Sequence, residues 1–524
     1  MPKPPITIQD KYLSFQILAL ATFIVFALFI WQGSNGFDLS DEGYLWYGAK
    51  RVMLGEVPIR DFMSYDPGRY YWSAALMSLY GDNGILALRG AVAIFQMMGL
   101  FIGLLLIARV VKKQNFLYLL LSAVTLIVWM HPRHKLFDIS LSILLIGVLT
   151  FLIQNPTSRR YFYVGVCVGL IAIFGRNHGI YGVAGSLGVM AWLNIKRTEG
   201  TNLIKGFALW AAGVAFGYMP VLFMILLAPD FAGAFWESIR FLFEIEATNL
   251  PRPIPWPWRV DFASVPIGVA IRQVFIGLFY IATVIFGVLS IVWVVWQKIQ
   301  NKNVPPALVA ATFMALPYAQ YAYSRAGIVH LAQGIFPLLV GCLVLLATQH
   351  AKIKWPLAIM LCVASLWVMP VFHPGWQCQI NKQCVSIEIS RSNLQIDSQT
   401  ASKIGILWNL ALQYTSDNQS FIAVPFLPGA YALLDRKSPM WEIFPVWPRS
   451  QAFEQAEIKR IKTAMPGFAF VLDYPLDGRD ELRFRNTHPL IHQYILDHFE
   501  ELASLPNSAF HIYKAKSGGN EENH

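Results

Sequence analysis

Charged residues are scarce in this chain of 524 residues. Only 14% of them are Asp, Glu, Lys or Arg, against about 25% in a typical soluble domain, and 56% are apolar. So few charges cannot cover the outside of so apolar a core, which argues against a soluble protein. Disorder is excluded by the same composition, because disordered chains are rich in charge and poor in aromatic residues, which make up 14% here.

Cysteine is also rare, with five in the chain. Cys167, Cys342 and Cys362 fall within apolar stretches, where we expect them to act as small packing residues. Cys378 and Cys384 follow the last apolar stretch, and an oxidising compartment would allow them to form a disulfide. Metal binding by this pair is the less favoured alternative, because no second Cys or His pair accompanies it.

Long apolar runs dominate what is present. A helix needs about 20 mostly apolar residues to cross a bilayer, so we predict a polytopic α-helical membrane protein with about eleven transmembrane helices. The first run is not interpreted as a cleaved signal, because the residues after Trp31 offer no clear cleavage site. The runs lie near residues 15–32, 84–108, 115–130, 136–153, 161–175, 179–194, 204–228, 268–296, 304–323, 326–348 and 355–372, the pair 161–175 and 179–194 being short enough for a re-entrant hairpin.

The net charge of +10 follows from membrane orientation. If the N-terminus is inside and the spans alternate, the inside segments collect basic residues such as Arg109, Arg160 and Lys298 and almost no acidic ones. Cytoplasmic loops carry such an excess, so we predict an inner (plasma) membrane protein with a cytoplasmic N-terminus and a periplasmic C-terminal region. The surplus therefore gives no reason to expect a nucleic-acid partner.

Two long segments lie on the predicted outer side of the membrane, a loop and a C-terminal domain. The loop at 33–83 is too long for a simple connector, and within it Tyr44–Leu54 has aromatic residues on one side, which is typical of an interfacial helix lying on the membrane. After the transmembrane module of residues 1–372 comes a soluble domain at 373–524. We predict an α/β or α+β fold for it, with buried strands at 421–424 and 468–474 and helices at 399–414 and 450–464.

Ionisable residues gather at the outer ends of the predicted spans, and charges at membrane depth usually serve a function. Carboxylates suit general-base work, and basic groups suit phosphate binding. We expect these outer turns to converge into one outward-facing pocket, although solvated loop charges and side chains that snorkel to headgroups are the alternative. The residues are Asp38, Asp41 and Glu42; His131, Arg133, His134, Lys135 and Asp138; Arg176, Asn177 and His178; and Arg325 and His330.

A divalent metal ion is a candidate cofactor of the second of these turns. His131, His134 and Asp138 are residue types that ligate such ions, but their spacing matches no specific metal motif. The sequence also has no Walker A loop, no G-x-S-x-G and no H-E-x-x-H. Surface positions for the two histidines remain the alternative.

The first loop has a recognisable order of motifs. An Asp41–Glu42 pair follows the first span, then come Gly-Glu-Val-Pro-Ile-Arg-Asp-Phe at 55–62 and Asp-Pro-Gly-Arg-Tyr-Tyr-Trp at 66–72. This loop resembles the C-type (GT-C) membrane glycosyltransferases. Within them it is most similar to the protein O-mannosyltransferase and aminoarabinose-transferase group, including the bacterial RgtA/B/C/D-like proteins. The sequence departs from the group at Asp66-Pro67-Gly68, where a second proline is more usual.

The resemblance implies a reaction in which a sugar moves from a polyprenyl phosphate donor to a lipid, polysaccharide or protein acceptor. Asp41 is similar to the catalytic Asp of the family, with Glu42 beside it. Arg69 lies where the family places residues near the lipid phosphate, Arg176 and Arg325 are further phosphate candidates, and Asp138 resembles a second acidic position. Asp38, Arg60, Arg133, Lys135, Asn177 and His330 complete the candidate substrate-binding set.

Two other classes of function fit part of the pattern. A transporter or lipid flippase would suit many spans with buried charge, but inverted repeats and broken helices at mid-membrane are typical of transporters, and the sequence shows no such repeat. A non-catalytic envelope assembly protein would use the outer domain to bind a partner. Release of the sugar from a polyprenyl phosphate donor distinguishes the enzyme from both.

Overall fold

The structure is a computed structural model that describes residues 8–111, 115–196, 202–246, 249–381, 384–390, 392–504 and 509–516. The chain forms two compact units: unit 1 comprises Met1–Gly33 with Arg89–Trp376, and unit 2 comprises Ser34–Leu88 with Gln377–His524. The first outer loop is therefore part of the same compact unit as the C-terminal region, whereas the sequence prediction grouped that loop with the transmembrane module.

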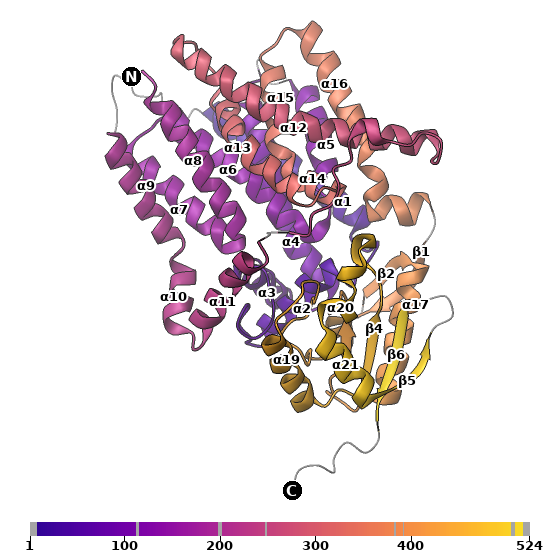
Figure 1. The fold of residues 1–524 in the computed structure, drawn as a ribbon. Coiled ribbons are helices and arrows are strands. Elements are labelled where there is room, and N and C mark those ends of the chain that lie inside the picture. Colours follow the sequence, from indigo (N-terminus) through magenta and orange to yellow (C-terminus); the bar gives the residue numbers. More distant parts are fainter. Residues whose placement is uncertain are drawn as a thin grey trace. The chain divides into compact units, whose positions relative to one another are not determined.

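Unit 1 is a bundle of helices (Figure 1), as the apolar runs predicted. Each of the eleven runs coincides with one helix or with two consecutive helices. Within the described residues, five helices are long and apolar enough to span a membrane, or up to seven if two bent pairs, α9–α10 and α14–α15, each count as one span. The helices are α1 (Ile8–Gln32), α4 (Ile85–Ala108), α5 (Phe116–Trp129), α6 (Leu136–Gln154), α7 (Ser158–Phe174), α8 (Arg176–Asn194), α9 (Leu203–Gly217), α10 (Met219–Leu227), α11 (Phe231–Glu244), α12 (Ile267–Ile299), α13 (Pro306–Ser324), α14 (Ile328–Gly334), α15 (Phe336–Ala347) and α16 (Ala351–Val368).

Glycine lets two of these helices approach closely. A Cβ atom on Gly165 of α7 would lie 2.0 Å from the Trp210 carbonyl oxygen, and one on Gly213 of α9 would lie 2.2 Å from that of Phe162. Both glycines begin a G-x-x-x-G pattern, ending at residues 169 and 217, which is common where membrane helices pack backbone to backbone. The close packing of α7 on α9 therefore follows directly from the sequence.

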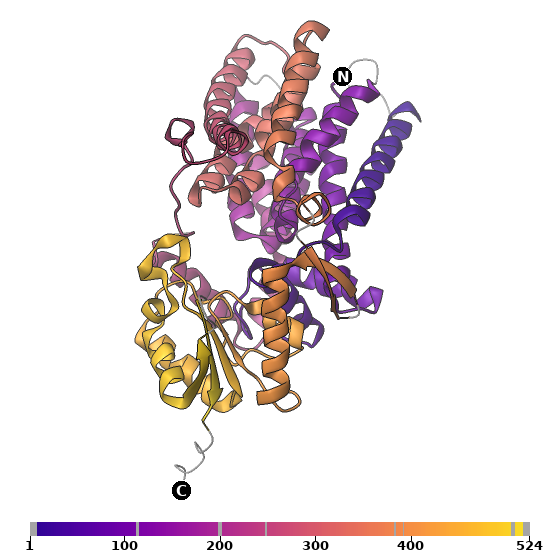
Figure 2. The same ribbon diagram turned by 90° about the vertical axis from the view of Figure 1, so that its right-hand side faces the viewer.

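Unit 2 is an α/β unit built on a four-stranded sheet of order β3-β4-β6-β5. β3 and β4 are parallel, with Ala423 opposite Phe470, and the other pairs are antiparallel. Helix α17 covers one face of the sheet and α21 the other (Figure 2). The elements are α2 (Asp41–Met53), α3 (Gly68–Tyr80), β1 (Cys384–Ile389), β2 (Ser392–Asp397), α17 (Ser398–Tyr414), β3 (Ile422–Val424), α18 (Pro428–Leu434), α19 (Gln451–Ala464), β4 (Phe468–Leu472), α20 (Phe484–Thr487), α21 (Pro489–His498), β5 (Phe499–Ser504) and β6 (Phe510–Ala515).

The core of unit 2 lies between the sheet and the helices. Ile422, Val471, Ile461 and Ile491 are all nearly inaccessible to solvent and belong to one apolar cluster. The continuous apolar run at 468–472 explains why β4 sits inside the sheet, since a strand covered on both faces needs no polar alternation. The predicted fold class, a polytopic helical membrane protein with a small C-terminal sheet domain, is confirmed.

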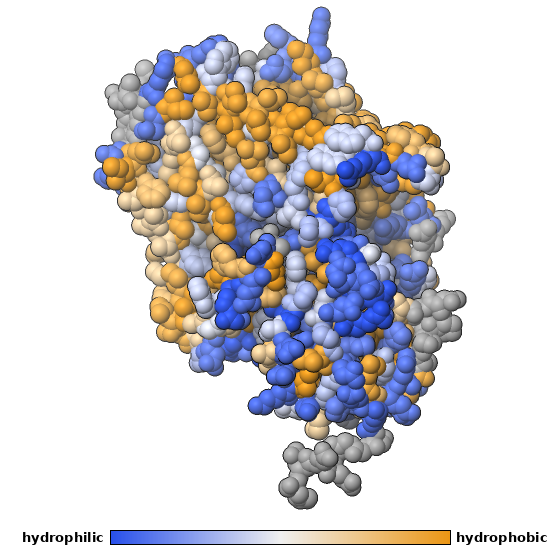
Figure 3. Space-filling view, in the orientation of Figure 1, coloured by the Kyte–Doolittle hydropathy of each residue, from blue (hydrophilic) through white to orange (hydrophobic). Residues whose placement is uncertain are grey.

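The surfaces of the two units differ in hydropathy. Figure 3 shows broad hydrophobic areas over the helices of unit 1 and a largely hydrophilic face over the strands and helices of unit 2. Helix α12 carries exposed apolar side chains, and Leu289 and Val292 are more than 60% exposed. Exposing such side chains to water would be costly. Large exposed apolar surfaces mark sites that contact a membrane or another protein, and this one fits a multi-pass membrane protein.

Candidate functional site

Three carboxylates meet where helix α2 begins. The Asp38 side chain accepts hydrogen bonds from the backbone N–H groups of Ser40 (2.9 Å) and Asp41 (3.1 Å), so it caps the turn that leads into the helix. Asp41 and Glu42 are the first two residues of α2. Anionic side chains are favoured in a first helical turn, where unpaired N–H groups carry partial positive charge. The local sequence thus gathers three acids within five residues.

The Asp38 carboxyl has a strongly perturbed pKa. It keeps an accessible edge, but protein surrounds it on its other sides, and this desolvation raises its pKa to about 6. The negative charges of Asp41 and Glu42 act in the same direction. A carboxyl group that titrates near neutral pH can accept and return a proton under physiological conditions, which is what a general acid–base group requires.

Helix α2 is held rigidly behind these acids. A Cβ on Gly43 would lie 2.4 Å from the Cα of Gly429, so α2 and α18 touch through their backbones. Tyr44, Trp46 and Tyr47 are buried. The prediction that these aromatic side chains form a belt toward lipid is therefore wrong, whereas the interfacial position of the helix stays a prediction. The same aromatic face packs inside unit 2, because an amphipathic pattern does not reveal whether lipid or protein covers it.

Arg69 lies at the start of α3 and is buried in unit 2, with 3% of its surface exposed. Its guanidinium group is 4.7 Å from the centroid of the Tyr65 ring, and Tyr65 in turn contacts Tyr44 edge to face at 4.9 Å. The buried cation is thus connected through two aromatic rings to the helix that carries Asp41 and Glu42. Cations are favoured over aromatic faces, which explains how this arginine is tolerated in the interior.

Arg60 has a local role in the first loop. Its guanidinium donates two hydrogen bonds of 2.8 Å to the carboxylate of Asp61, which also accepts one from the Val57 N–H at 2.7 Å. Partial burial would raise the pKa of Asp61, but the hydrogen bonds and charge of Arg60 outweigh it and lower that pKa. Much of the Arg60 charge is thus balanced by its neighbour, and the pair orders the turn before α3.

In unit 1 a buried polar network joins three helices. His178 of α8 has its Nε2 atom 2.8 Å from Asp138 Oδ1 on α6 and its Nδ1 atom 2.7 Å from the hydroxyl of Tyr318 on α13. All three residues are less than 5% exposed. Burying polar groups in an apolar bundle is costly unless they are hydrogen-bonded, and here each group finds its partner on another helix.

The network extends to a further candidate residue through neighbouring rings that are tilted against one another. The ring centroids of His178 and Tyr321 are 5.9 Å apart, and those of Tyr321 and His330 are 5.8 Å apart. His330 also lies 2.9 Å from the side-chain amide of Asn249. The structure therefore connects Asp138 and His330, two of the sequence-predicted residues, through His178 and Tyr321.

The predicted basic residues of unit 1 lie at helix ends and bind oxygen atoms of neighbouring segments. Arg176 donates to the Ser238 hydroxyl at 3.0 Å, Arg325 to the Leu250 carbonyl at 2.9 Å and Arg133 to the Gln32 carbonyl at 3.0 Å. Lys135 is buried in the short turn before α6, whereas Asn177 is exposed on α8.

The predicted metal site is not formed. Among the described residues, no three His, Cys, Asp or Glu side chains come together in a way that could hold a metal ion. Asp138 contacts His178, and the His131 ring packs against His373 at 4.9 Å. Burial lowers the pKa of His131, and the neighbouring His373 adds to this shift. A divalent ion at His131, His134 and Asp138 is thus not supported, because the three residues have other neighbours.

The cysteines are arranged as their positions in the sequence suggested. Cys378 and Cys384 form a disulfide in unit 2, whereas Cys167, Cys342 and Cys362 are free thiols in helices of unit 1. The disulfide links the segment that follows the last apolar helix to the first residue of β1.

Sequence reasoning missed two members of the buried network as site residues, His178 and Tyr318. His178 was noted only as part of the turn with Arg176 and Asn177, and Tyr318 lies within an apolar run that looked like ordinary packing. A histidine two residues after an arginine at a predicted helix start was a usable signal. The tyrosine offered none, because its partner is distant in sequence.

The fold is similar to that of ArnT, a member of the group that the 33–83 loop resembles, so the resemblance is confirmed at the level of the fold. Among the solved structures, ArnT from Cupriavidus metallidurans in the apo state is similar at a TM-score of 0.56 and 11% identity, covering 97% of this chain and 98% of that one.

Two further solved structures are also similar. ArnT from the same organism bound to undecaprenyl phosphate has a TM-score of 0.49 and 12% identity over 96% of this chain and 98% of that one. The Archaeoglobus fulgidus oligosaccharyltransferase tethered with an acceptor peptide has 0.44 and 11%, over 97% and 74%. No protein-family model and no curated protein matches the sequence.

Proposed function

We propose that this protein is an integral-membrane glycosyltransferase that moves a sugar from a polyprenyl phosphate donor to an acceptor hydroxyl at the outer face of the membrane. The observation that carries the proposal is the cluster of Asp38, Asp41 and Glu42 at the start of α2. The fold shared with ArnT supports it, and ArnT from C. metallidurans is itself a protein that binds undecaprenyl phosphate.

The chemistry assigns separate roles to acids and bases. The carboxylate of Asp41, assisted by Glu42, takes the proton of an acceptor hydroxyl, whose oxygen forms a bond to the anomeric carbon of the sugar. The bond between that carbon and the phosphate oxygen breaks, and the polyprenyl phosphate leaves with the electron pair. Arg69, Arg176 and Arg325 are the proposed partners of this anion, because guanidinium groups bind phosphate bidentately.

The remaining candidates are assigned to the substrates. Asp38 caps the first turn of α2 and is proposed to exchange a proton with the other two acids of the cluster. Arg60 orders the turn before α3 through its hydrogen bonds to Asp61. Arg133, Lys135, Asp138, Asn177 and His330 are proposed to contact the donor or acceptor. The acceptor is a lipid, polysaccharide or protein. We further propose that residues 1–372 form the membrane module, that residues 373–524 form a periplasmic domain, and that the N-terminus is cytoplasmic in the inner (plasma) membrane.

The test is transfer from a defined donor. Purified full-length protein in liposomes is incubated with undecaprenyl phosphate linked to a radiolabelled hexose or aminopentose, and label released from the carrier is measured. We expect release by the wild type and none by Asp41→Asn. Asp417→Asn is the matched control, because Asp417 is an exposed acid of unit 2 outside the first loop. Normal release by Asp41→Asn would refute the assignment of the base.

The same liposomes separate an enzyme from a transporter or flippase. A flippase moves the intact labelled lipid to the other leaflet without breaking the sugar–phosphate bond, whereas a transferase leaves unlabelled carrier behind. Movement of intact donor without cleavage would overturn the proposal, and so would absence of both activities with every donor and acceptor tried, which would favour an assembly protein.

A further inference from the structure

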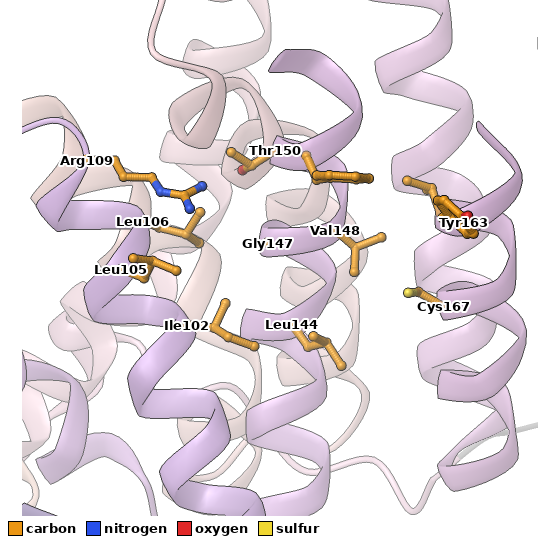
Figure 4. A pocket seen from close by; sticks show the side chains of 12 residues that line it. Ile102, Leu105, Leu106, Arg109, Leu144, Gly147, Val148, Thr150, Tyr163 and Cys167 are labelled. Atoms are coloured by element: carbon orange, nitrogen blue, oxygen red, sulfur yellow. The ribbon is translucent and has the colours of Figure 1, made fainter. Parts of the chain in front are cut away.

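A groove opens between three helices of unit 1, and none of the candidate residues lines it. It encloses about 310 Å³ and lies between α4, α6 and α7. Its lining is almost wholly apolar, and Figure 4 shows these side chains facing a common space. The apolar lining includes Ile102, Leu105, Leu106, Leu144, Val148 and Val164.

One end of the groove carries positive charge. Arg109, just after the end of α4, lines the groove and is exposed. Arg160 of α7 stacks over the Phe151 ring, with its guanidinium carbon 3.9 Å from the ring centroid, and donates to the Phe151 carbonyl. Phe151 itself lines the groove. One guanidinium group thus lines the end of an apolar channel that the charge distribution predicts to face the cytoplasm, and a second contacts one of its lining rings.

The rings at this end indicate the depth of the groove in a membrane. Phe151 is 41% exposed and Tyr163 is 54% exposed, although both line the groove. Aromatic side chains with accessible faces are enriched at the membrane–water interface. The charged end of the groove therefore lies at headgroup level, and its apolar length extends along the helices into the hydrocarbon region.

We infer that this groove binds an anionic glycerophospholipid of the leaflet at that end, with the headgroup phosphate at Arg109 and one acyl chain against Ile102, Leu144 and Val148. The occupant has to be apolar along its length and negative at its end, and basic pockets between membrane helices bind such headgroups. A partner helix is excluded by size, because a helix with its side chains is about 10 Å across and 310 Å³ would admit only a fragment of one.

The geometry also explains why the groove is open. A Cβ on Gly147 would lie 2.8 Å from Ile102 Cγ2, so the bare backbone of α6 at this position lets α4 come close and forms the floor. Thr150 turns its hydroxyl away to the Ile146 carbonyl at 2.7 Å. The one polar lining residue of α6 is thus satisfied within its own helix, and the channel stays apolar up to Arg109.

The experiment measures lipid retained by the full-length protein. Protein purified in a mild detergent is titrated with dioleoyl phosphatidylglycerol or dioleoyl phosphatidylcholine, and bound lipid is counted by native mass spectrometry. We expect phosphatidylglycerol to be retained about fivefold more tightly, since one Lys or Arg near the surface contributes about that factor. Arg109→Gln should remove the preference. Arg159→Gln is the matched control, because Arg159 is exposed beside Arg160 but does not line the groove.

A second measurement locates the acyl chain. Phosphatidylglycerol with a diazirine in one chain is photoactivated, and we expect crosslinks to peptides of α4, α6 and α7. Leu144→Trp, which fills the groove, should abolish them while thermal unfolding shows that the variant is folded. Equal retention of both lipids, an unchanged preference in Arg109→Gln, equal competition by oleate, or crosslinks only elsewhere would each overturn the inference. None of these readouts depends on glycosyl transfer.

Discussion

The two units treat buried acidic groups in opposite ways. In unit 1, Asp138 lies among helices with His178 and Tyr318 at hydrogen-bond distance, and each polar group has a partner from another helix. In unit 2, three carboxylates crowd one helix start, and the pKa of Asp38 rises to about 6 because of desolvation and the charges of its neighbours. The first arrangement stabilises a fold, and the second stores an unfavourable interaction.

This difference indicates where chemistry belongs. Structure alone would separate like charges or pair each with a cation, as unit 2 itself does where Glu442 contacts both Arg449 (2.7 Å) and His488 (2.9 Å). At the start of α2, by contrast, three acids lie within five residues, and the charges of Asp41 and Glu42 contribute to the raised pKa of Asp38. Groups held in an electrostatically unfavourable arrangement cluster at functional sites, so the comparison favours a catalytic role for the α2 cluster and a mainly structural one for the network around His178.

The largest expected effect is on catalysis in unit 2. Asp41→Asn should reduce glycosyl transfer by at least a factor of about 100 to 10,000, the usual contribution of a general base, and leave the thermal midpoint unchanged. Asp138→Asn should instead lower the thermal midpoint. Transfer rates and unfolding curves on the same preparations check this. If Asp41→Asn unfolded early while keeping its activity, the contrast between the units would be reversed.

Next in size is the buried network of unit 1. His178→Leu should cost about 3–5 kcal/mol of unfolding free energy, because it removes the hydrogen-bond partner that His178 provides to the buried carboxyl group of Asp138. Replacing all three members, as Asp138→Leu, His178→Leu and Tyr318→Phe, should cost less than the single change, because polar groups that bond to one another are then removed together. Unfolding of detergent-solubilised protein gives both numbers.

Tyr181→Phe is the control for this series. Tyr181 is on the same helix as His178, and its hydroxyl donates to Gln320 at 2.8 Å in an exposed position. Its loss should cost about 1 kcal/mol or less. A cost for His178→Leu as small as that of the control would mean that the network contributes no special stability, and the proposed contact with substrate would then be the main role of Asp138.

A smaller effect is expected from the disulfide. It lies in unit 2, so a reducing agent should change the stability of that unit and not of unit 1. Reducing Cys378–Cys384 releases a short loop, worth about 2 kcal/mol by chain entropy, and should lower the unfolding temperature of unit 2. The cysteines of unit 1 are already free thiols, so dithiothreitol should not change the unfolding temperature of unit 1. The doubly substituted variant Cys378→Ser, Cys384→Ser should unfold at the same temperature with and without reductant, and a remaining response would place the sensitivity elsewhere.

The sequence predicted the helices of unit 1 well because each apolar run is as long as the element it forms. In the C-terminal region the expected segments at 399–414 and 450–464 appear as α17 and α19, and the two apolar strands appear as β3 and β4. Periodicity and run length are local properties, so one chain suffices to find them. What depends on distant partners, such as the burial of Tyr44 or the Asp138–His178–Tyr318 contacts, could not be predicted.

The acids of the first loop were identified as candidates from their order along the chain, because residues 38, 41 and 42 are close in sequence and share one turn. The raised pKa of Asp38 could not be predicted from the sequence. Desolvation of Asp38 depends on the atoms that surround it in the folded unit, and a motif does not record them. The same holds for Arg60, whose charge is balanced by the adjacent Asp61 in a geometry that the motif alone does not require.

The smallest effect is the pH dependence of unit 2 stability caused by Asp38. Its pKa in the folded protein is about 6, above the ordinary value of 3.8, so the folded state binds the proton more tightly than the unfolded chain does. Any stability linked to that proton is fully present below pH 3.8 and is lost as the pH rises through 6.

Asp38→Asn cannot titrate, and it should therefore unfold at a higher temperature than the wild type above pH 7. The advantage should shrink between pH 6 and pH 4, and part of it is offset by the weaker cap that Asn provides to the N–H groups of Ser40 and Asp41. Thermal unfolding from pH 4 to pH 8 measures the difference, with Asp417→Asn expected to give a flat profile. A difference that does not grow with pH would show that the α2 cluster is as well balanced as the pairs of unit 1, and the contrast between the two units would then rest on catalysis alone.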